Sequence, residues 1–473
     1  MMVALQSGGM RPLAMLPEIL LFAGGLACLL GGSFTPRERQ WRLRAVAAAA
    51  LAASVIAALV GAGTGTAFEG GFAIDVGTTT ARVVAAGATL LVLGLAGDEI
   101  AGAGRESETY ALLLFATTGT LVLAGAHDLL VLAVGFLLAS IPLYALVGLA
   151  GSAHAAEAAL KTYLLGALFG ILLLLGVTLL YGMAGTTAYP ALAASLGAAP
   201  GPAVVVGVMA VIAGLMFKAG GVPAHFWVPD AAQGASGTVA AFVTTVPKVG
   251  ALVAVFRLVV ALPHGGGWEV LVGALAVLSM SVANLAAFGQ DDPRRLLGWS
   301  TVSQVGYLLV PVAAAGRSDL ALPALLLYLA GYALTNVAAF AVTTALPDAR
   351  TLGDFAGLVR ARPLLALALV VALLGLVGTP PTVVFVGKLL AATSAWDAGM
   401  AWLTGVLLLN SLVSLFYYLR WIAPALLRDG RESALGAPRT WSTGVAIGAS
   451  ALSLLAGVLA GVLWHLVAGP LLG

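Results

Sequence analysis

All four lysines of this chain lie inside long apolar segments. They are Lys161, Lys218, Lys248 and Lys388, while the basic residues assigned to loops are all arginine. An ammonium group at the centre of a bilayer costs roughly 3 kcal/mol on insertion scales, so these positions require a reason. A desolvated lysine can release its proton near neutral pH, whereas arginine effectively never does. The lysines therefore predict a proton relay inside a membrane.

Lys161 also has a simpler interpretation. Glu157 precedes it by four residues, in the order that favours a helical ion pair. A lysine near a helix end commonly extends its ammonium group to the membrane surface. Lys161 is therefore either a relay group or half of a surface ion pair. Lys218, Lys248 and Lys388 have long apolar flanks on both sides and form the predicted relay.

The composition indicates that these lysines lie within a membrane. Of the 473 residues, 61% are hydrophobic and 9% are charged, whereas about 25% of a soluble domain is charged. Apolar windows of about 20 residues, each able to cross a bilayer, recur along the chain. They predict an all-α polytopic membrane protein without a cleavable signal peptide or a separate soluble domain. The fourteen predicted spans lie at about 13–32, 43–62, 79–97, 108–125, 127–149, 157–183, 203–224, 235–262, 268–288, 293–313, 319–344, 363–393, 399–421 and 440–468.

Two of these spans contain helix-breaking sequences. The seventh is interrupted at AGGVP (219–223) and the twelfth at VGTPP (377–381). Proline removes a backbone donor, so the hydrogen-bond ladder should open in mid-membrane, where it is tolerated only inside protein or beside a wet cavity. Lys218 precedes the first break and Lys388 follows the second, which indicates an ion path at the breaks. The breaking residues are Gly220, Gly221, Pro223, Gly378, Pro380 and Pro381.

The breaks also suggest an internal repeat. Residues 108–262 and 263–425 each contain five predicted spans and one break, after three spans in 1–107 and before a last one in 426–473. An odd number of spans reverses direction, so the second block is predicted to be an inverted copy of the first. The competing explanation is that glycine and proline are simply common in membrane helices.

The loop arginines predict the orientation. Because cytoplasmic loops collect positive charge, the side with more arginines is predicted to be cytoplasmic, with both termini on the opposite side of a bacterial inner membrane. Only Arg11, Arg82 and Arg317 are assigned to that opposite side. The net charge of +2 follows from this topology and does not indicate a nucleic-acid partner. The cytoplasmic set is Arg37, Arg39, Arg42, Arg44, Arg105, Arg294, Arg295, Arg350, Arg360, Arg362, Arg420, Arg428, Arg431 and Arg439.

Redox chemistry and metal binding are not predicted for this chain. Its single cysteine, Cys28, argues against disulfides, cysteine-ligated zinc and iron–sulfur centres. The sequence also lacks a glycine-rich nucleotide loop and a His/Cys spacing typical of metal sites. We therefore expect no cofactor-binding residues and no metal ligands in the chain.

The longest motif, FKAGGVPAHFWVPDAAQGASGTVAAFVTTVPKVGALVAVFRL (217–258), resembles the signature of the antiporter-like membrane subunits of respiratory complex I. DPRRLLGWSTVSQVGYLL (292–309) and NSLVSLFYYLR (410–420) agree with it, and the resemblance covers about residues 12–425. The early PEIL (17–20) is most similar to the subunit N family of NADH:quinone oxidoreductases. The resemblance implies a fourteen-helix subunit that moves protons along a hydrated lysine axis matching Lys218, Lys248 and Lys388. It also implies partner subunits that hold NADH, FMN, iron–sulfur clusters and the quinone whose reduction drives the protons.

Two positions depart from that family's pattern. Leu137 stands where the family carries a glutamate that pairs with the lysine at Lys218, and Gln304 stands where it carries a histidine. Glutamine can hold a water molecule but cannot carry a charge. Either Asp128, Glu157, His225 or water compensates, or the coupling of this subunit differs from that of the family. His225 is either a relay group or a hydrogen-bonded brace, and Lys161 and Gln304 are further secondary relay candidates.

Other polar residues are weaker candidates. Asp230 is expected to cap the eighth span or, alternatively, to lie near the mouth of a cavity, and Glu18 is expected to be structural. Tyr307, Tyr328, Tyr332 and Asn336 either line a hydrated path or pack as ordinary core residues.

Two other functions remain open at this point. The chain could belong to a multi-subunit sodium/proton antiporter, whose chains share the broken helices and lysines. It could also be a complex I subunit kept as a scaffold with impaired pumping, because the glutamate is missing at Leu137.

Overall fold

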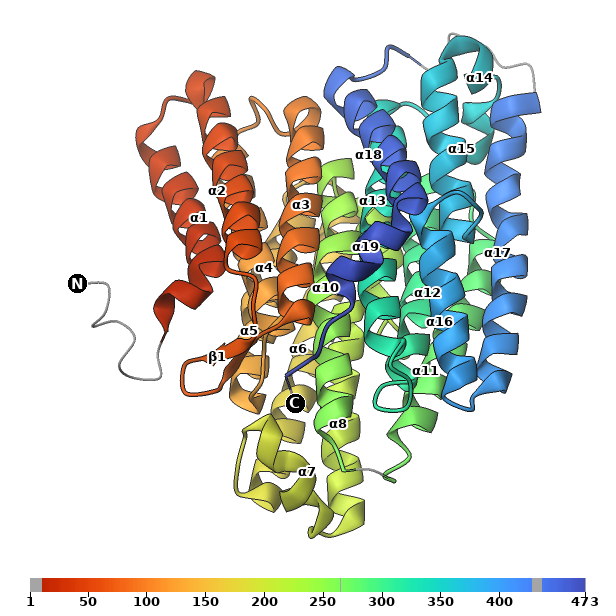
Figure 1. The fold of residues 1–473 in the computed structure, drawn as a ribbon. Helices are drawn as coiled ribbons and strands as arrows, with labels where there is room; N and C mark the ends of the chain where they lie inside the picture. The colour runs from red at the N-terminus through yellow and green to blue at the C-terminus, as the bar shows by residue number, and fades with distance from the viewer. Residues whose placement is uncertain (1–10, 264, 428–435, 473) are drawn as a thin grey trace.

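The computed structural model describes residues 11–263, 265–427 and 436–472 of a chain that is almost entirely helical (Figure 1). Thirteen helices within those ranges are long and apolar enough to cross a membrane. The remaining predicted span corresponds to two shorter helices, α15 and α16. Two of the loop arginines, Arg428 and Arg431, fall outside the described residues.

The helices of the first half are α1 (Leu16–Phe34), α2 (Trp41–Val60), α3 (Val76–Glu99), α4 (Glu106–Ala124), α5 (Leu129–Gly148), α6 (Ala153–Ala184), α7 (Tyr189–Gly197), α8 (Gly201–Ala219), α9 (Trp227–Gly234) and α10 (Gly237–Ala261). Those of the second half are α11 (Trp268–Ala287), α12 (Pro293–Ala313), α13 (Ala321–Ala345), α14 (Leu358–Ala361), α15 (Pro363–Val377), α16 (Val383–Asp397), α17 (Ala401–Leu427), α18 (Thr440–Val458) and α19 (Ala460–Val467). The strands β1 (Gly65–Ala67) and β2 (Phe72–Ile74) form a small antiparallel hairpin.

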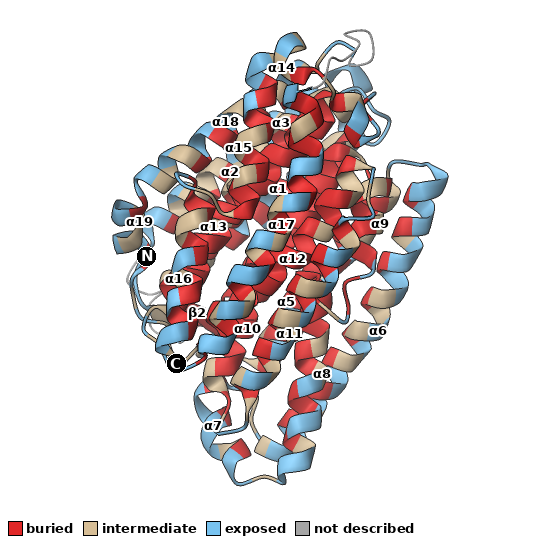
Figure 2. Cartoon of the chain, turned by 90° about the vertical axis from the view of Figure 1, so that its right-hand side faces the viewer, coloured by how far each residue is buried: buried red, intermediate tan, exposed pale blue. Residues whose placement is uncertain are grey.

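Three helices form the centre of the bundle. The membrane-length windows of α10, α12 and α13 are 100%, 94% and 89% buried, compared with 28% for α2 and α18. Figure 2 shows these central helices mostly in red, surrounded by outer helices with exposed faces. Because lipid cannot reach α10, α12 or α13, their polar side chains must be satisfied inside the protein.

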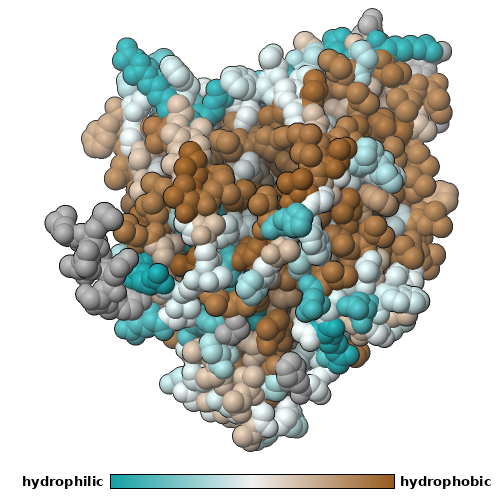
Figure 3. Space-filling view, viewed as in Figure 1, coloured by the Kyte–Doolittle hydropathy of each residue, from teal (hydrophilic) through white to brown (hydrophobic). Residues whose placement is uncertain are grey.

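The outer surface is that of a membrane protein. Apolar side chains such as Leu164 and Ile171 on α6 and Leu408 on α17 are more than half exposed. In Figure 3 brown side chains form a broad band across the visible face, with teal side chains along the upper rim and again below the band. A bilayer covers such a band, and the polar rims meet water.

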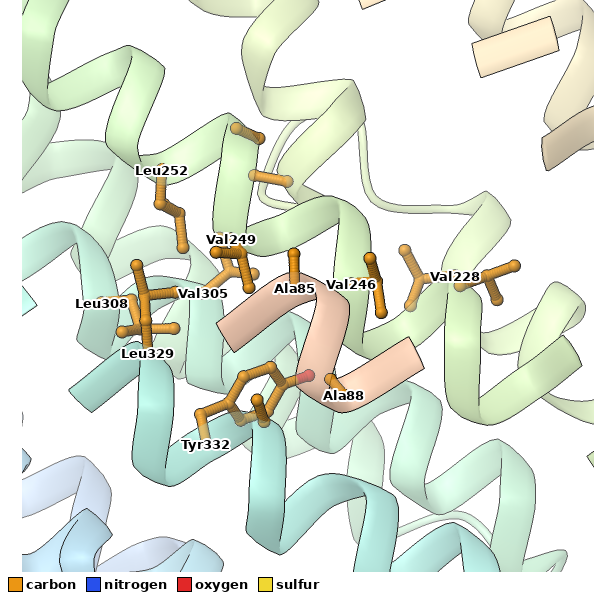
Figure 4. Close-up of a cluster of buried hydrophobic side chains, with 14 of the residues drawn as sticks. Ala85, Ala88, Val228, Val246, Val249, Leu252, Val305, Leu308, Leu329 and Tyr332 are labelled. Atoms are coloured by element: carbon orange, nitrogen blue, oxygen red, sulfur yellow. The ribbon is translucent and has the colours of Figure 1, made fainter. Parts of the chain in front are cut away.

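The centre is held together by close apolar packing. Figure 4 shows Val246 and Val249 of α10 beside Ala85 and Ala88 of α3, with Leu252 further along α10. All five side chains are at most 4% exposed. The small alanines let α3 approach α10 closely along this stretch.

Both predicted breaks coincide with helix ends. α8 ends at Ala219 and α15 at Val377, and each is followed by a glycine in the left-handed conformation, Gly220 with φ 81° and Gly378 with φ 90°. A side chain would be strained at either glycine. α15 starts at the end of the bundle that carries α14, and α8 starts at the opposite end, beside α7 (Figure 1). The inverted repeat itself stays a prediction.

Two expectations about charged residues are wrong. Asp230 does not cap α10, because the Ser236 hydroxyl accepts the hydrogen bond from the Val239 amide and Asp230 lies within α9. Arg82 does not lie in a loop, because it is buried in α3, where Nε and Nη2 donate to the Glu18 carboxylate at 2.7 and 2.8 Å. The ion pair between Glu18 and Arg82 therefore joins α1 to α3.

Candidate proton path

Lys388 lies in α16, and its side chain reaches back across the break to the end of α15. Its ammonium donates to the Leu376 and Val377 carbonyls at 3.1 and 2.8 Å. These carbonyls belong to the last turn of α15, where helix carbonyls have lost their own donors and the helix dipole is negative. The ammonium also lies 3.8 Å from the centre of the Tyr307 ring. The break thus builds a cation site from backbone and an aromatic face, without an acidic side chain.

Lys248 is held in a related way in the middle of α10. Pro247 lacks an amide hydrogen, so the carbonyl four residues earlier, that of Val243, has no helical donor. The Lys248 ammonium donates to this carbonyl at 2.7 Å and lies 4.8 Å from the centre of the Trp227 ring. We did not expect a role for Pro247, although the adjacent Pro-Lys pair in a long apolar segment is a usable signal.

Of the three lysines, Lys218 has the fewest contacts that stabilise its ammonium group. It is fully buried at the end of α8, and Nζ has no hydrogen-bond partner among the described residues. The Phe136 ring lies beside it, with its centre 5.4 Å from Nζ. Leu137, the position of the missing glutamate, is 41% exposed on the outer side of α5. No acidic side chain of the described residues bonds to Lys218. Its ammonium group is therefore not stabilised by an ion pair there.

Two separate hydrogen-bonded sets of polar groups lie near Lys388 and Lys248, one that includes the acceptor of Lys388 and one that reaches α10. Gln304 donates to the Leu376 carbonyl at 2.8 Å, the same oxygen that binds Lys388, and Tyr328 donates to Gln304 at 2.7 Å. One turn along α13, the Tyr332 hydroxyl donates to the Thr244 carbonyl of α10 at 2.6 Å. The side chains of Gln304, Tyr328 and Tyr332 are fully buried and come from α12 and α13, where lipid cannot enter.

Lys161 lies outside this central path. Its ammonium bonds to Glu157 at 2.7 Å and to Asp230 at 2.8 Å, and its side chain is 45% exposed. Asp230 also accepts from Arg295 at 2.6 Å. The structure therefore places Lys161 and Glu157 in an ion-pair network on the outside of the bundle. A relay role for either residue stays a prediction.

The other secondary candidates also lie apart from the three lysines' own contacts. His225 is buried in the loop after the first break, where its ring packs against Phe226 and Trp299 and Nδ1 has no partner among the described residues. Asp128 caps α5 by accepting from the Leu130 amide at 2.7 Å. Its other oxygen accepts from Thr187 at 2.5 Å. Asp128 therefore caps the first turn of α5.

Replacing Gln304 with leucine should destabilise the protein. Tyr328 would lose its acceptor in a fully buried site, and the Leu376 carbonyl would keep only Lys388. Leaving a buried donor unsatisfied costs about 1–3 kcal/mol. We expect thermal unfolding of the purified protein at a lower temperature than wild type. Gln304→His, which can still accept from Tyr328, should retain more of the stability, and equal losses in both variants would contradict this reading.

Comparisons with known proteins identify the family. Residues 126–414 match the family described as NADH:quinone oxidoreductase/Mrp antiporter, TM. The chain is 59% identical over 466 residues to NADH-quinone oxidoreductase subunit N of Mycobacterium sp. (strain JLS), covering 97% of this chain and 98% of the relative. It is 50% identical to NADH-quinone oxidoreductase subunit N 1 of Streptomyces griseus subsp. griseus, covering 95% and 96% of the two chains.

Solved structures agree with this assignment. A chain of respiratory complex I from Thermus thermophilus with bound aureothin matches with a TM-score of 0.83 at 32% identity, over 96% of this chain and 100% of that one. A chain of the Mrp complex from Dietzia sp. DQ12-45-1b also gives a TM-score of 0.83, but at 23% identity it shows a common fold alone. The full-length similarity to subunit N decides between the two branches of the matching family. This chain belongs to the subunit N family of NADH-quinone oxidoreductases.

Proposed function

We propose that this chain, a multi-pass membrane subunit of a proton-translocating NADH-quinone oxidoreductase, moves protons along the line of Lys218, Lys248 and Lys388. The observation that carries the proposal is the way the chain holds Lys248 and Lys388. Each ammonium bonds to carbonyls that a proline or a helix end has freed from the helix ladder. A neutral amine could occupy the same place, because no buried carboxylate would be left without a partner. Such a site can therefore lose and regain a proton at low cost.

The groups between the lysines supply the connection. The Tyr328 and Tyr332 hydroxyls can each donate and accept a hydrogen bond and Gln304 can hold water, so a proton can pass through the hydroxyls and intervening water. The Lys248 ammonium lies at the first break, two residues after Lys218 in the chain, because a Cβ atom on Gly220 would lie 3.5 Å from it. Release of a proton by one lysine would favour charging of its neighbour by removing a like charge. Quinone reduction in partner subunits would drive this exchange.

The assembly and orientation belong to the same proposal. The relatives named as subunit N support assembly with other membrane subunits and, through them, with the redox partners that hold NADH, FMN, iron–sulfur clusters and quinone. The loop arginines support a bacterial inner membrane with both termini on the non-cytoplasmic side. A tagged chain should copurify with quinone-reducing subunits, and its isolation as a free antiporter would contradict the assignment.

Replacing Lys388 with alanine tests the relay. In the purified complex reconstituted in liposomes, we expect the initial rate of proton pumping to fall about tenfold or more, since a positioned proton-transfer group contributes roughly 10²–10⁴-fold. Lys388→Arg keeps the cation but cannot release a proton, so it should pump as poorly as Lys388→Ala.

The arginine variant separates the relay from an anchoring role. If Lys388 only donated hydrogen bonds to the free carbonyls at the end of α15, arginine could make the same contacts and would restore pumping. Arg317→Ala serves as a control, because it removes a cation from an exposed pair with Glu269 at the surface. Full pumping by Lys388→Ala would overturn the proposal.

A further inference from the structure

An apolar groove runs along the outer face of the bundle between α3 and α18 (Figure 1). Only apolar side chains and one glycine line it, and its volume is about 420 Å³. Leu90 of α3 and Leu452 of α18 belong to the lining and are 38% and 44% exposed, so the groove is open on the side that faces lipid. An empty groove forfeits the dispersion contacts of its walls. In a membrane, an apolar chain is therefore expected to fill it.

Gly87 keeps the groove wide. It lies in the middle of the α3 wall, between Val83 and Leu91, and a Cβ atom built on it would meet no atom within 4 Å. Alanine would fit at this position and would favour the helix, because glycine in a helix interior is destabilising. The packing of α3 against its neighbours therefore does not require this glycine, and the space beside it is free for a ligand.

The groove is narrow compared with a protein helix. Val83 and Leu91 lie about 12 Å apart along α3, at 1.5 Å per residue, so the mean cross-section of the groove is about 35 Å². An α-helix with its side chains is about 10–12 Å across, and its cross-section is more than twice as large. The groove thus fits an extended hydrocarbon chain better than a transmembrane helix of another subunit.

A guanidinium group without an anion lies at the arginine-rich end of the same two helices. Arg44 of α2 packs against Gly97 of α3, and its guanidinium carbon lies 4.8 Å from the centre of the Trp441 ring of α18. Nη1 is buried there without a partner, and Arg44 forms no hydrogen bond or ion pair with any of the described residues. Asp98, the next residue of α3, instead accepts from the amide and hydroxyl of Ser442 at 2.7 and 2.8 Å. Since partly buried charges are normally paired, Arg44 lacks a counterion.

The guanidinium and the groove are spaced like the two parts of one lipid. α3 and α18 run antiparallel, with Gly97 beside Trp441 at the arginine-rich end and Val83 and Ala456 lining the groove deeper in the bundle. From Gly97 to Val83, α3 extends about 21 Å. Half of a bilayer with its headgroups is about 20–22 Å thick. A phosphate bound to Arg44 would therefore place an acyl chain of the same molecule in the groove.

We propose that the groove binds an anionic phospholipid, with its phosphate on Arg44 and one acyl chain between α3 and α18. Arginine binds phosphate through two parallel hydrogen bonds and also stacks on aromatic rings. Trp41 and Trp441, in the first turns of α2 and α18, are 54% and 55% exposed, as tryptophans at a membrane surface are. Arg42, next to the Trp41 ring, adds a second positive charge that favours an anionic headgroup. No lysine of the proton path lines this groove.

A photoreactive lipid tests the site in the whole complex reconstituted in phosphatidylcholine liposomes. A trace of phosphatidylglycerol with a diazirine in its acyl chain should label peptides that contain residues 83–91 and 452–456, mapped by mass spectrometry. Arg44→Gln should reduce this labelling about tenfold, because the phosphate loses its charge-assisted hydrogen bonds. Gly87→Leu should reduce it by a similar factor, because the new side chain occupies the groove. Gly405→Leu is the matched control, since a Cβ atom on this glycine of α17 also meets open space but lies outside the groove.

A second probe separates a specific lipid from a groove that any chain fills. Phosphatidylcholine with the same diazirine should label these peptides about tenfold less, because its headgroup carries no net charge. Equal labelling by both probes, together with full labelling in Arg44→Gln, would overturn the proposal. So would wild-type protein without label on α3 and α18, as expected if a helix of another subunit covered the groove. If Arg44→Gln does not assemble, Arg44→Lys keeps the charge without the paired geometry and should label less than wild type. None of these measurements depends on pumping, so Lys388→Ala stays an independent test of the relay.

Discussion

Replacing Lys248 with alanine is expected to lower NADH-driven proton pumping by the whole complex about tenfold or more. Lys248 lies in the helix that is buried along its whole membrane-length window, and its ammonium bonds to the Val243 carbonyl that Pro247 leaves free. Removal of a positioned proton-transfer group costs roughly 10²–10⁴-fold, and no other lysine lies on α10. The measurement is the initial rate of acidification in liposomes, normalised to NADH oxidation.

A second variant tests how the lysine is positioned. Pro247→Ala supplies an amide that can bond to the Val243 carbonyl, so the ammonium would lose its partner while the lysine remains. We expect pumping between those of wild type and Lys248→Ala, with a shift in its pH dependence, because the proton-transfer group itself is retained. Pro323→Ala is a suitable control, since Pro323 lies in the first turn of α13, where no helical donor is lost. Wild-type pumping in Lys248→Ala would contradict the role of this residue.

Much of the fold could be predicted from the sequence, since a bilayer imposes its own length and composition on each span. Thirteen of the fourteen predicted spans correspond to helices of membrane length, and the remaining one is the broken pair α15 and α16. Short elements such as α7 and α9 were not predicted, because nine or eight residues give too little periodicity. Asp230 was misassigned for a related reason. Its partners Lys161 and Arg295 are 69 and 65 residues away, and only the fold brings them together.

The site was predictable as a set of lysines but not as a set of contacts. A charged residue in an apolar segment is visible in the sequence, and so is a proline. The acceptors of Lys248 and Lys388 are backbone carbonyls, which carry no sequence signal of their own. The departure at Leu137 is also clearer in the structure, because that side chain faces outward and the Lys218 ammonium instead lies beside Phe136.

Asp75→Asn is expected to destabilise the protein more than any surface substitution. Asp75 and Arg257 form a fully buried bidentate pair, with oxygen–nitrogen distances of 2.8 and 2.5 Å. Arg257 also donates to the Ala124 carbonyl at 2.7 Å, and Asp75 accepts from the amides of Thr78 and Leu472, so the pair joins α10, α4, α3 and the C-terminal segment. Removing one partner of a buried pair costs about 3–5 kcal/mol, because the other charge is left uncompensated.

The stability lost in Asp75→Asn can be measured as the decrease in the thermal unfolding temperature of the purified protein and as the decrease in the amount of the chain in membranes. Asp75→Ala combined with Arg257→Leu removes both charges and should recover part of the stability lost in Asp75→Asn alone. A double variant as unstable as the sum of its two single variants would show that the charges do not act as a pair.

The pH dependence of stability gives an independent check on the same pair. Burial alone would raise the pKa of Asp75, but the adjacent Arg257 guanidinium and the amides of Thr78 and Leu472 outweigh burial and hold that pKa below its usual value. A carboxylate with a lowered folded-state pKa contributes stability that is fully present above its unfolded-state pKa of about 3.9 and is lost as the pH falls through the lower, folded-state value. The difference in stability between wild type and Asp75→Asn should therefore be constant from neutral pH down to about 5 and shrink below about 4. A difference that already narrowed between pH 7 and 5 would mean that the pair is not held in the buried, charged form.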